Sequence, residues 1–334
     1  MSELRRDPLM RRWVIIAPDR RADLISRRLE RPLLAQTKPC PFCPGNEHMN
    51  PQEIYVVRSE QTPHNPQGWA VRITPDRKPL LRIEGTVERR GVGPFDMMSA
   101  TGAHELVTDT ADHSAHWADF DLAQMQRLLG SYIYRYNDLR NDPRFRHVVI
   151  MKNYGAPWSR YAHQHSHIVA MPFTPRRIDD EFIGATAYYQ HKERCVFCDA
   201  LQEEERRGER VVAVNEDFVA FAPFASGFPF EVWLMPRRHA PDFGEIGERA
   251  LPTLAALFKE VMTKLRATLH DPHFSLALHS APLNGQNRDE FHWHWELIPH
   301  LSGELGMEWA TGVYFNPIAP EDAAACLREG RPLS

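Results

Sequence analysis

The 334-residue chain contains no run of about 18 uninterrupted apolar residues, the length that a transmembrane helix needs. Its N-terminus is basic but has no apolar stretch of the length found in signal peptides. We therefore expect a cytoplasmic protein that does not enter a membrane. The chain also lacks an excess of positive charge, since its formal net charge is −4. This excludes the basic surface typical of nucleic-acid-binding proteins.

Cysteine is scarce, and its total of five is an odd number. Four of the cysteines form two C-x-x-C pairs, Cys40/Cys43 and Cys195/Cys198. In a reducing compartment this spacing indicates a metal site rather than a disulfide. The fifth, Cys326, lies in an alanine-rich segment, and we expect it to be a buried helix residue.

Short runs of β-branched and aromatic residues bounded by Pro, Asp and Gly predict strands along the whole chain. In the first half they are WVIIAP, EIYVVR, WAVRITP, RHVVIMKN and HSHIVAMP, and in the second VVAVNEDFVAFAP, PFEVWLMP, FSLALHSAP and FHWHWELIPH. The spacing of apolar residues predicts one long helix in each half, at 119–140 and at 245–269. Because the same order of elements occurs twice, the sequence indicates an internal duplication with a boundary near 175–190.

Histidines repeat in the same order as the cysteine pairs. Each C-x-x-C is followed by a lone histidine, and an H-x-H strand begins 50 residues later in the first half and 53 later in the second. Two thiolates and two imidazoles suit a closed, tetrahedral, structural zinc site. We therefore predict two zinc sites, with the ligands Cys40, Cys43, His113 and His163 in the first half and Cys195, Cys198, His239 and His292 in the second.

A competing assignment exists for the metal of the second half. It gathers Glu181, His279, His292 and His294 around an ion such as iron or zinc. Both assignments use His292, so they cannot both be fully occupied. We favour the cysteine-containing site because its ligands repeat those of the first half.

The segment His163-Gln-His165-Ser-His167 indicates which reaction the protein could catalyse. Alternate residues of a strand share a face, so the three imidazoles point the same way. With His163 on zinc, an oriented His165 remains that can attack phosphorus as a nucleophile. The turn before it supplies polar and basic side chains that suit a phosphate, namely Lys152, Asn153, Ser159 and Arg160. The second half has Glu296 in place of the third histidine, so we assign that half to metal binding and scaffolding.

In these motifs the chain resembles the galactose-1-phosphate uridylyltransferase family of the histidine-triad superfamily. The similar segments are RRDPLMRRWVIIAPDR, CPFCPGNE, the Asp-His at 112–113, KNYG, HQHSHIVAMP, APFASGFPFEVWLMPRRH and GMEWATGVYFNPIAPEDAA. The resemblance implies an α+β fold of two tandem histidine-triad-like halves, residues 1–178 and 179–334. Each half is then an antiparallel sheet with flanking helices, and the protein is a homodimer.

The resemblance also implies a ping-pong reaction through a covalent nucleotidyl-histidine. By position, His165 matches the family's nucleophile, and the first cysteine set matches its structural zinc site. The second C-x-x-C is similar to the two-zinc, ADP-glucose phosphorylase type of member. Arg72 and Asp76 match the nucleoside end of the site, and Glu308 matches a hexose-binding glutamate.

The chain departs from the family pattern at two positions near the nucleophile. The family has a glutamine two residues after the nucleophile, which binds the phosphoryl group of the intermediate. Here that residue is His167, which can hold phosphoryl oxygens or protonate a leaving group. Arg160 replaces a small residue of the phosphate-binding turn and would suit an extra anion such as phosphate or sulfate. The C-terminal motif also lacks the family's hexose-binding glutamine.

These features together predict a nucleotidyltransferase. It would move AMP from a nucleotide anhydride of the ADP-glucose or adenylylsulfate type to phosphate or a phosphate-bearing acceptor, with His165 and His167 as catalytic residues. One alternative is a uridylyltransferase acting on UDP-glucose and galactose 1-phosphate. Further alternatives are a dinucleoside polyphosphate phosphorylase or hydrolase, and a non-catalytic nucleotide-binding protein.

Overall fold

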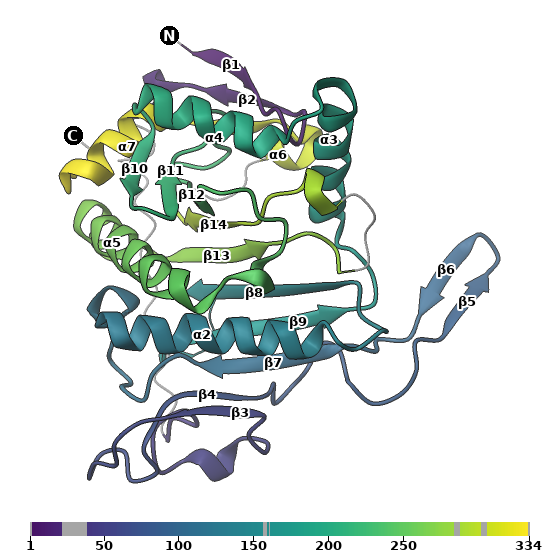
Figure 1. Cartoon of the computed structure of the whole chain (residues 1–334), viewed down its shortest axis with the longest axis vertical. Coiled ribbons are helices and arrows are strands. Elements are labelled where there is room, and N and C mark those ends of the chain that lie inside the picture. Colours follow the sequence, from purple (N-terminus) through teal and green to yellow (C-terminus); the bar gives the residue numbers. More distant parts are fainter. Residues whose placement is uncertain are drawn as a thin grey trace.

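The computed structural model describes residues 2–21, 39–155, 159, 161–283, 288–301 and 306–332. Within these residues the main element is a ten-stranded antiparallel sheet (Figure 1) of order β10-β11-β12-β14-β13-β8-β9-β7-β4-β3. Its first-half strands are β3 (Tyr55–Arg58), β4 (Trp69–Pro75), β7 (Ala103–Thr108), β8 (His147–Tyr154) and β9 (His165–Met171). Its second-half strands are β10 (Val211–Val214), β11 (Phe218–Phe221), β12 (Val232–Pro236), β13 (Phe274–His279) and β14 (His294–Pro299).

The strand order is symmetric about the centre of the sheet, where β8 pairs with β13. Outward from this pair the order is β9, β7, β4, β3 on one side and β14, β12, β11, β10 on the other. The two halves thus join edge to edge. The predicted α+β fold with repeated antiparallel sheets and flanking helices is confirmed, and the duplication appears as one continuous sheet.

Two long helices, α2 (Leu122–Leu139) and α5 (Leu251–Leu269), hold equivalent places in the two halves and lie side by side (Figure 1). Helix α2 lies within the predicted range 119–140 and begins at Leu122 because Asp121 caps it, accepting a hydrogen bond from the Gln124 backbone N–H at 2.7 Å. Helix α5 begins later than the predicted residue 245, because two single turns of 3₁₀ helix precede it and Pro252 lies in its first turn.

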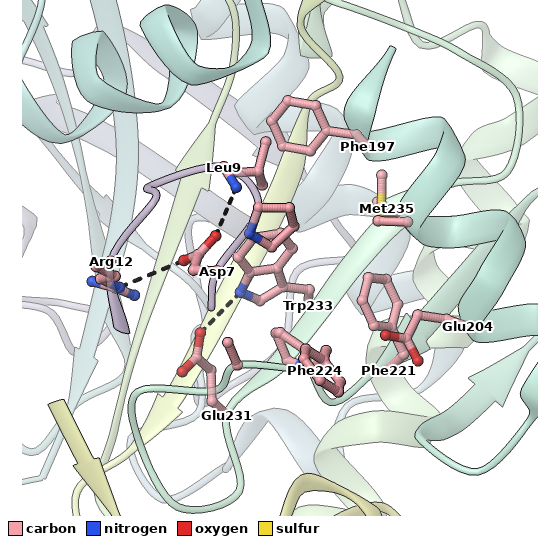
Figure 2. Close-up of a pocket in the computed structure, with 14 residues that line it drawn as sticks. Asp7, Leu9, Arg12, Phe197, Glu204, Phe221, Phe224, Glu231, Trp233 and Met235 are labelled. Atoms are coloured by element: carbon pink, nitrogen blue, oxygen red, sulfur yellow. Dashed lines mark hydrogen bonds and ion pairs between the residues drawn. The ribbon is translucent and has the colours of Figure 1, made fainter. Parts of the chain in front are cut away.

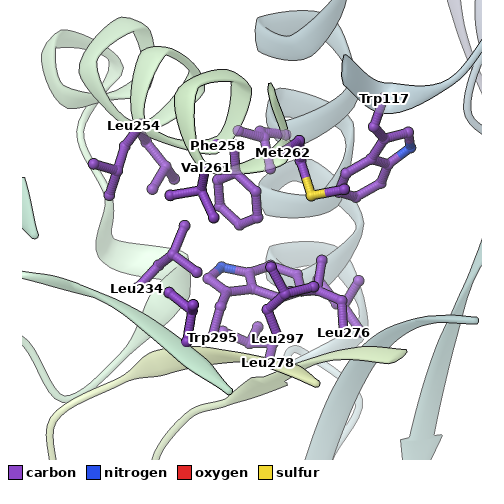
Figure 3. Close-up of a cluster of buried hydrophobic side chains, with 14 of the residues drawn as sticks. Trp117, Leu234, Leu254, Phe258, Val261, Met262, Leu276, Leu278, Trp295 and Leu297 are labelled. Atoms are coloured by element: carbon purple, nitrogen blue, oxygen red, sulfur yellow. The ribbon is translucent and has the colours of Figure 1, made fainter. Parts of the chain in front are cut away.

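The core lies between these two helices and one face of the sheet, which we call the helix face. Phe258 of α5 packs edge to face on Trp295 of β14, with ring centroids 5.5 Å apart (Figure 3). Ile168 of β9 belongs to the same core. Because side chains alternate along a strand, His165, His167, His294 and Glu296 lie on the opposite face, which we call the histidine face.

The histidine face of the second half is covered by α3 (Arg176–Lys192) and α4 (Val196–Arg207). Ala185 of α3 and Phe197 of α4 belong to an apolar cluster with Phe221 of β11 and Trp233 of β12. On the first half, the same face carries a smaller apolar cluster of Cys40, Phe42 and Leu106. The site that the sequence predicts therefore lies where these two helices do not cover the sheet.

The remaining elements lie around this sheet. A small sheet joins β1 (Glu3–Arg6) and β2 (Trp13–Ile16) to β15 (Tyr314–Asn316), so the N-terminal residues pair with the C-terminal segment. A hairpin of β5 (Arg89–Val92) and β6 (Phe95–Met98) projects from the body (Figure 1). The predicted boundary at 178/179 falls inside α3, and the division into 1–178 and 179–334 stays a prediction.

The C-terminal helices are α6 (Gly306–Thr311) and α7 (Pro320–Glu329). Cys326 is buried in α7, as predicted. Single 3₁₀ turns are formed by Pro18–Arg20, Glu47–Met49, Trp117–Asp119, Phe243–Glu245, Glu248–Ala250 and Arg288–Glu290. Among the helices of the described ranges, none has both the length and the apolar character needed to span a bilayer.

Candidate active site and metal centres

His165 is the first residue of β9 and lies on the histidine face of the first half. Its Nδ1 lies 2.8 Å from the backbone oxygen of His163, so the Nδ1–H donates to this carbonyl. The proton on Nδ1 leaves a lone pair on Nε2. Burial, together with the nearby Lys152 ammonium, lowers the pKa of His165 to about 3. A neutral, oriented imidazole with a lone pair on Nε2 is the form that attacks phosphorus.

A buried polar network on the helix face of the sheet binds the backbone of His165. The Lys152 ammonium donates to the His165 carbonyl at 3.0 Å and to Asp109 at 2.8 Å. Asp109 also accepts hydrogen bonds from Ser166 Oγ and from the Trp117 indole N–H, both at 2.8 Å. Lys152 points away from the histidine face because it follows Met151, whose partner across the ladder is His167. It therefore positions the His165 backbone, a role different from the phosphate contact that the sequence suggested.

Replacement of Lys152 by methionine is expected to destabilise the fold by about 3–5 kcal/mol. The substitution leaves the buried Asp109 carboxylate without its cation, and the remaining hydrogen bonds cannot offset that charge. Urea unfolding followed by tryptophan fluorescence measures the loss. The matched control is Lys192→Met at the exposed end of α3, which should change stability by less than about 0.5 kcal/mol. Equal stabilities for the two variants would contradict the assignment.

His167 lies beside His165 on the histidine face, with ring centroids 5.3 Å apart. Its Nδ1 lies 3.1 Å from Nε2 of His104 in β7 and 3.7 Å from Oδ2 of Asp76. The side chain is 20% exposed, and burial and the neighbouring His104 lower its pKa to about 4. The structure thus brings Asp76 close to His167, whereas His104 was not identified from the sequence.

Arg72 in β4 also lies on the histidine face. Leu106 of β7 pairs with His167 on one side and with Thr74 of β4 on the other, and Arg72 is two residues before Thr74. Its Nε donates to Glu53 at 2.7 Å, and its guanidinium lies over the Trp69 ring. The side chain is buried and already ion-paired.

The predicted phosphate-binding turn is only partly described. Asn153 accepts a hydrogen bond from Ser275 Oγ at 2.6 Å. Ser159 is buried, and its hydroxyl donates to the backbone oxygen of Tyr161 at 3.0 Å. Arg160 lies outside the described residues. The phosphate-contact role of these three residues stays a prediction.

Glu308 lies in α6, which packs against β15. Figure 1 shows α6 at the same end of the molecule as β1 and β2, beyond the second-half strands and away from β9. A single chain therefore does not bring Glu308 to His165.

The first predicted zinc site is assembled as expected, since the ligand atoms of Cys40, Cys43, His113 and His163 all lie within 4.8 Å of one another. Cys43 Sγ is 3.3 Å from His113 Nδ1 and 3.7 Å from His163 Nδ1. Sulfur and nitrogen ligands of one tetrahedral zinc lie about 3.6 Å apart, given bond lengths of about 2.3 and 2.0–2.1 Å. His163 Nε2 lies 2.8 Å from the Thr110 carbonyl and donates to it, which leaves the Nδ1 lone pair for a metal. The donor set and its spacing fit zinc.

The second predicted zinc site repeats this arrangement with Cys195, Cys198, His239 and His292. Cys198 Sγ lies 3.3 Å from His239 Nδ1 and 3.5 Å from His292 Nδ1. The structure thus places His292 with the cysteines, as we favoured.

A separate buried cluster contains Glu181, His279, His294 and Glu296. This cluster differs from the competing assignment in one member. The ring of His292 faces the cysteines, and Glu296, two residues beyond His294, takes its place. His279 Nδ1 lies 3.0 Å from both Glu181 oxygens. Arg177 donates to Glu296 at 2.7 Å and so supplies a positive charge to the cluster. The two clusters share no residue, so their occupancies are independent.

A pocket on the second half lies between the N-terminal segment, α4, β11 and β12 (Figure 2). It encloses about 520 Å³, part of it open to solvent. Glu231 in its wall accepts hydrogen bonds from the Trp233 indole N–H and the Gly227 backbone N–H, and burial raises its pKa to about 7. None of the lining residues belongs to the cluster around His165, so we do not assign the reaction to this pocket.

Comparison with known proteins gives a consistent result. Residues 181–305 match the family model described as galactose-1-phosphate uridyl transferase, C-terminal domain. ADP-glucose phosphorylase of Arabidopsis thaliana is 29% identical over 334 residues, which cover 98% of this chain and 92% of that protein. Galactose-1-phosphate uridylyltransferase of Thermotoga maritima is 29% identical over 340 residues, covering 98% of each.

Solved structures show the same similarity over the whole chain. The crystal structure of an ADP-glucose phosphorylase from Arabidopsis thaliana with bound ADP-glucose superposes with a TM-score of 0.82 at 28% identity, covering 98% of this chain and 99% of that one. A further structure, of a uridylyltransferase, has a TM-score of 0.76 at 23% identity and covers 99% of this chain and 98% of that one. The second similarity supports the fold alone.

Proposed function

We propose that the chain is a nucleotidyltransferase of the galactose-1-phosphate uridylyltransferase family and that it transfers AMP by way of His165. The donor would be a nucleotide anhydride of the ADP-glucose or adenylylsulfate type, and the acceptor phosphate or a phosphate-bearing molecule. The observation that carries the proposal is the fixed orientation of His165, whose Nδ1 is bound to the His163 carbonyl. The similarity to a phosphorylase solved with ADP-glucose supports the choice of donor.

The reaction would proceed in two displacements at the same phosphorus. In the first, His165 Nε2 attacks the α-phosphorus, a nitrogen–phosphorus bond forms, and the bond to the leaving oxygen breaks. The sugar phosphate or sulfate departs with that electron pair. In the second, an acceptor oxygen attacks the phosphorus and His165 recovers its lone pair. The His163 carbonyl would hold the His165 ring, and Lys152 would hold the His165 backbone. This fixed orientation of the attacking nitrogen would lower the activation barrier.

We further propose that each chain holds two structural zinc ions, one in each C-x-x-C cluster. Zinc would supply no chemistry to the transferred phosphoryl group, because four protein ligands close its coordination. The chain's own contribution at the first cluster is more direct. His163 offers its ring to the metal and its carbonyl to His165, so the metal ligand also orients the nucleophile.

We also propose that the protein acts as a homodimer. Glu308 and the His165 site lie apart in one chain (Figure 1), so any role of Glu308 at the substrate requires a second chain. Sedimentation velocity at micromolar concentration would show a dimer, whereas a monomer that retains full turnover would exclude this role.

Intact mass after incubation without acceptor tests the function directly. The protein is mixed separately with ADP-glucose, adenylylsulfate and UDP-glucose, with His165→Ala as the control. We expect an AMP adduct from one of the adenylyl donors that is discharged by phosphate and is missing from the variant. Turnover without added phosphate would indicate a hydrolase instead. The absence of any adduct from all three donors would contradict the proposal.

Uridylyl transfer is the second candidate, because the Thermotoga maritima relative of equal identity is a galactose-1-phosphate uridylyltransferase. The same experiment separates the two. A UMP adduct that is discharged by galactose 1-phosphate would support uridylyl transfer.

A further inference from the structure

His167 takes part in a hydrogen-bonded chain that begins at a backbone amide. The Leu80 backbone N–H donates to Nδ1 of His104 at 3.1 Å. On the other side of the same ring, His104 Nε2 lies 3.1 Å from His167 Nδ1. His104 is buried, whereas His167 is partly exposed beside His165.

This chain of contacts determines which ring nitrogens carry protons. A neutral imidazole has one N–H and one acceptor nitrogen. Nδ1 of His104 accepts from Leu80, so its proton must be on Nε2, and this proton points to His167 Nδ1. His167 Nδ1 is therefore an acceptor, and the proton of the neutral His167 ring is on Nε2. Burial, which holds the pKa of His167 at about 4, keeps this ring neutral near pH 7.

We propose that His104 is a positioning residue that fixes His167 as an Nε2–H donor to the phosphoryl group carried by His165. The inference rests on the proposed function and deepens it. A neutral imidazole locked in this tautomer offers one N–H, as a side-chain amide would, and cannot present a lone pair to the phosphoryl oxygens. Preorganised donors of this kind stabilise the charge that develops in the transition state.

The geometry argues against a metal ion at the same place. Asp76, His104 and His167 have ligand atoms within 4.8 Å of one another, a set that could hold a metal. A metal on His104 Nε2 would need the lone pair there and the proton on Nδ1. That proton would then face the Leu80 N–H, placing two donors against each other. Asp76 Oδ2 lies 3.8 Å from His104 Nε2, too far to take its proton.

The second half shows that the fold itself does not require the histidine pair. Leu106 faces His167 across the β7–β9 ladder, and Trp233 faces Glu296 across the β12–β14 ladder. His104 precedes Leu106 by two residues, and the residue two before Trp233 is Glu231. The half that carries the nucleophile thus has two histidines where the other half has two glutamates.

A double-mutant cycle tests the proposal. The variants are His104→Ala, His167→Gln and the double variant, and the measurement is the rate of adduct formation in a single turnover with the donor that labels His165. The single variant His104→Ala should slow adduct formation by about 10- to 100-fold, because His167 loses its fixed tautomer. In the His167→Gln background it should change the rate less than about threefold, since an amide donor has no tautomer to fix. His104→Gln, which keeps an N–H near His167, should recover much of the rate.

Equal losses from His104→Ala in both backgrounds would overturn the proposal, as would a wild-type rate for His104→Ala alone. Zinc content and the urea midpoint of each variant show whether it folds. A metal ion lost specifically from His104→Ala would make the cluster a metal site instead.

A second measurement does not depend on turnover. Long-range ¹H–¹⁵N spectra of the histidine-labelled protein distinguish Nε2–H from Nδ1–H tautomers, and the His167 signals are those missing from His167→Gln. The proposal requires the Nε2–H form in the wild type and its partial loss in His104→Ala. An Nδ1–H form in the wild type would contradict it even if adduct formation were confirmed. If no donor gives an adduct, the proposed function fails while the spectra still report on His104.

Discussion

Replacement of His165 by alanine is expected to lower nucleotidyl transfer by a factor on the order of 10⁵. His165 lies on the histidine face of β9, and its Nδ1–H donates to the His163 carbonyl. Among the described residues, no other side chain has both features. Without this imidazole, no covalent bond to phosphorus can form, and only binding and electrostatic contributions remain.

Steady-state assays with the donor identified by mass measure the effect. His64→Ala, at an exposed histidine in the turn between β3 and β4, is the matched control and should keep wild-type turnover. The variant at His165 should retain both zinc ions, because the contacts of His163 do not use the His165 ring. More than about 1% of wild-type turnover in His165→Ala would contradict the nucleophilic role.

The two clusters of cysteine and histidine are expected to differ in their effect on activity. Cys43→Ser should lose one zinc ion and slow transfer by about 100-fold or more, since displacement of His163 also moves the carbonyl that orients His165. Cys198→Ser should also lose one zinc ion, but its cluster is formed by residues of the second half, in α4 and just before β14. Its turnover per folded molecule should stay within about threefold of the wild type.

Metal analysis of the purified variants together with single-turnover rates tests this difference. The wild type should contain two zinc ions per chain, and each variant one fewer. Equal losses of activity in the two variants would show that zinc acts only through global stability. An unchanged zinc content in Cys43→Ser would contradict the first site itself.

The sequence predicted the parts of the site that depend on regular spacing. The C-x-x-C pairs and the histidines identified both cysteine clusters, because the same order of cysteines and histidines occurs in both halves. The alternation of side chains along a strand placed His165 and His167 on one face. The repeated order of elements predicted the duplication, although the joining of β8 to β13 in one sheet depends on pairing between residues that are more than 100 positions apart.

The sequence could not identify residues whose roles depend on strand register. His104 meets His167 across a separation of 63 residues, and no local pattern marks it as different from any strand histidine. Lys152 suited a phosphate by its chemistry, but its position after Met151 turns it to the helix face, where it meets Asp109. The competing metal assignment erred by one member, because the His292 ring lies against Cys198 and Glu296 takes its place in the Glu181 cluster.

Isotope exchange tests the central claim most directly. The enzyme is incubated with its nucleotide donor and the labelled leaving group of that donor, such as glucose 1-phosphate with ADP-glucose, in the absence of any acceptor. A covalent nucleotidyl-His165 intermediate predicts that label enters the donor at a rate comparable to turnover, and that His165→Ala abolishes this exchange. Full turnover with acceptor but no exchange without it would show direct transfer between bound substrates and would contradict the covalent mechanism.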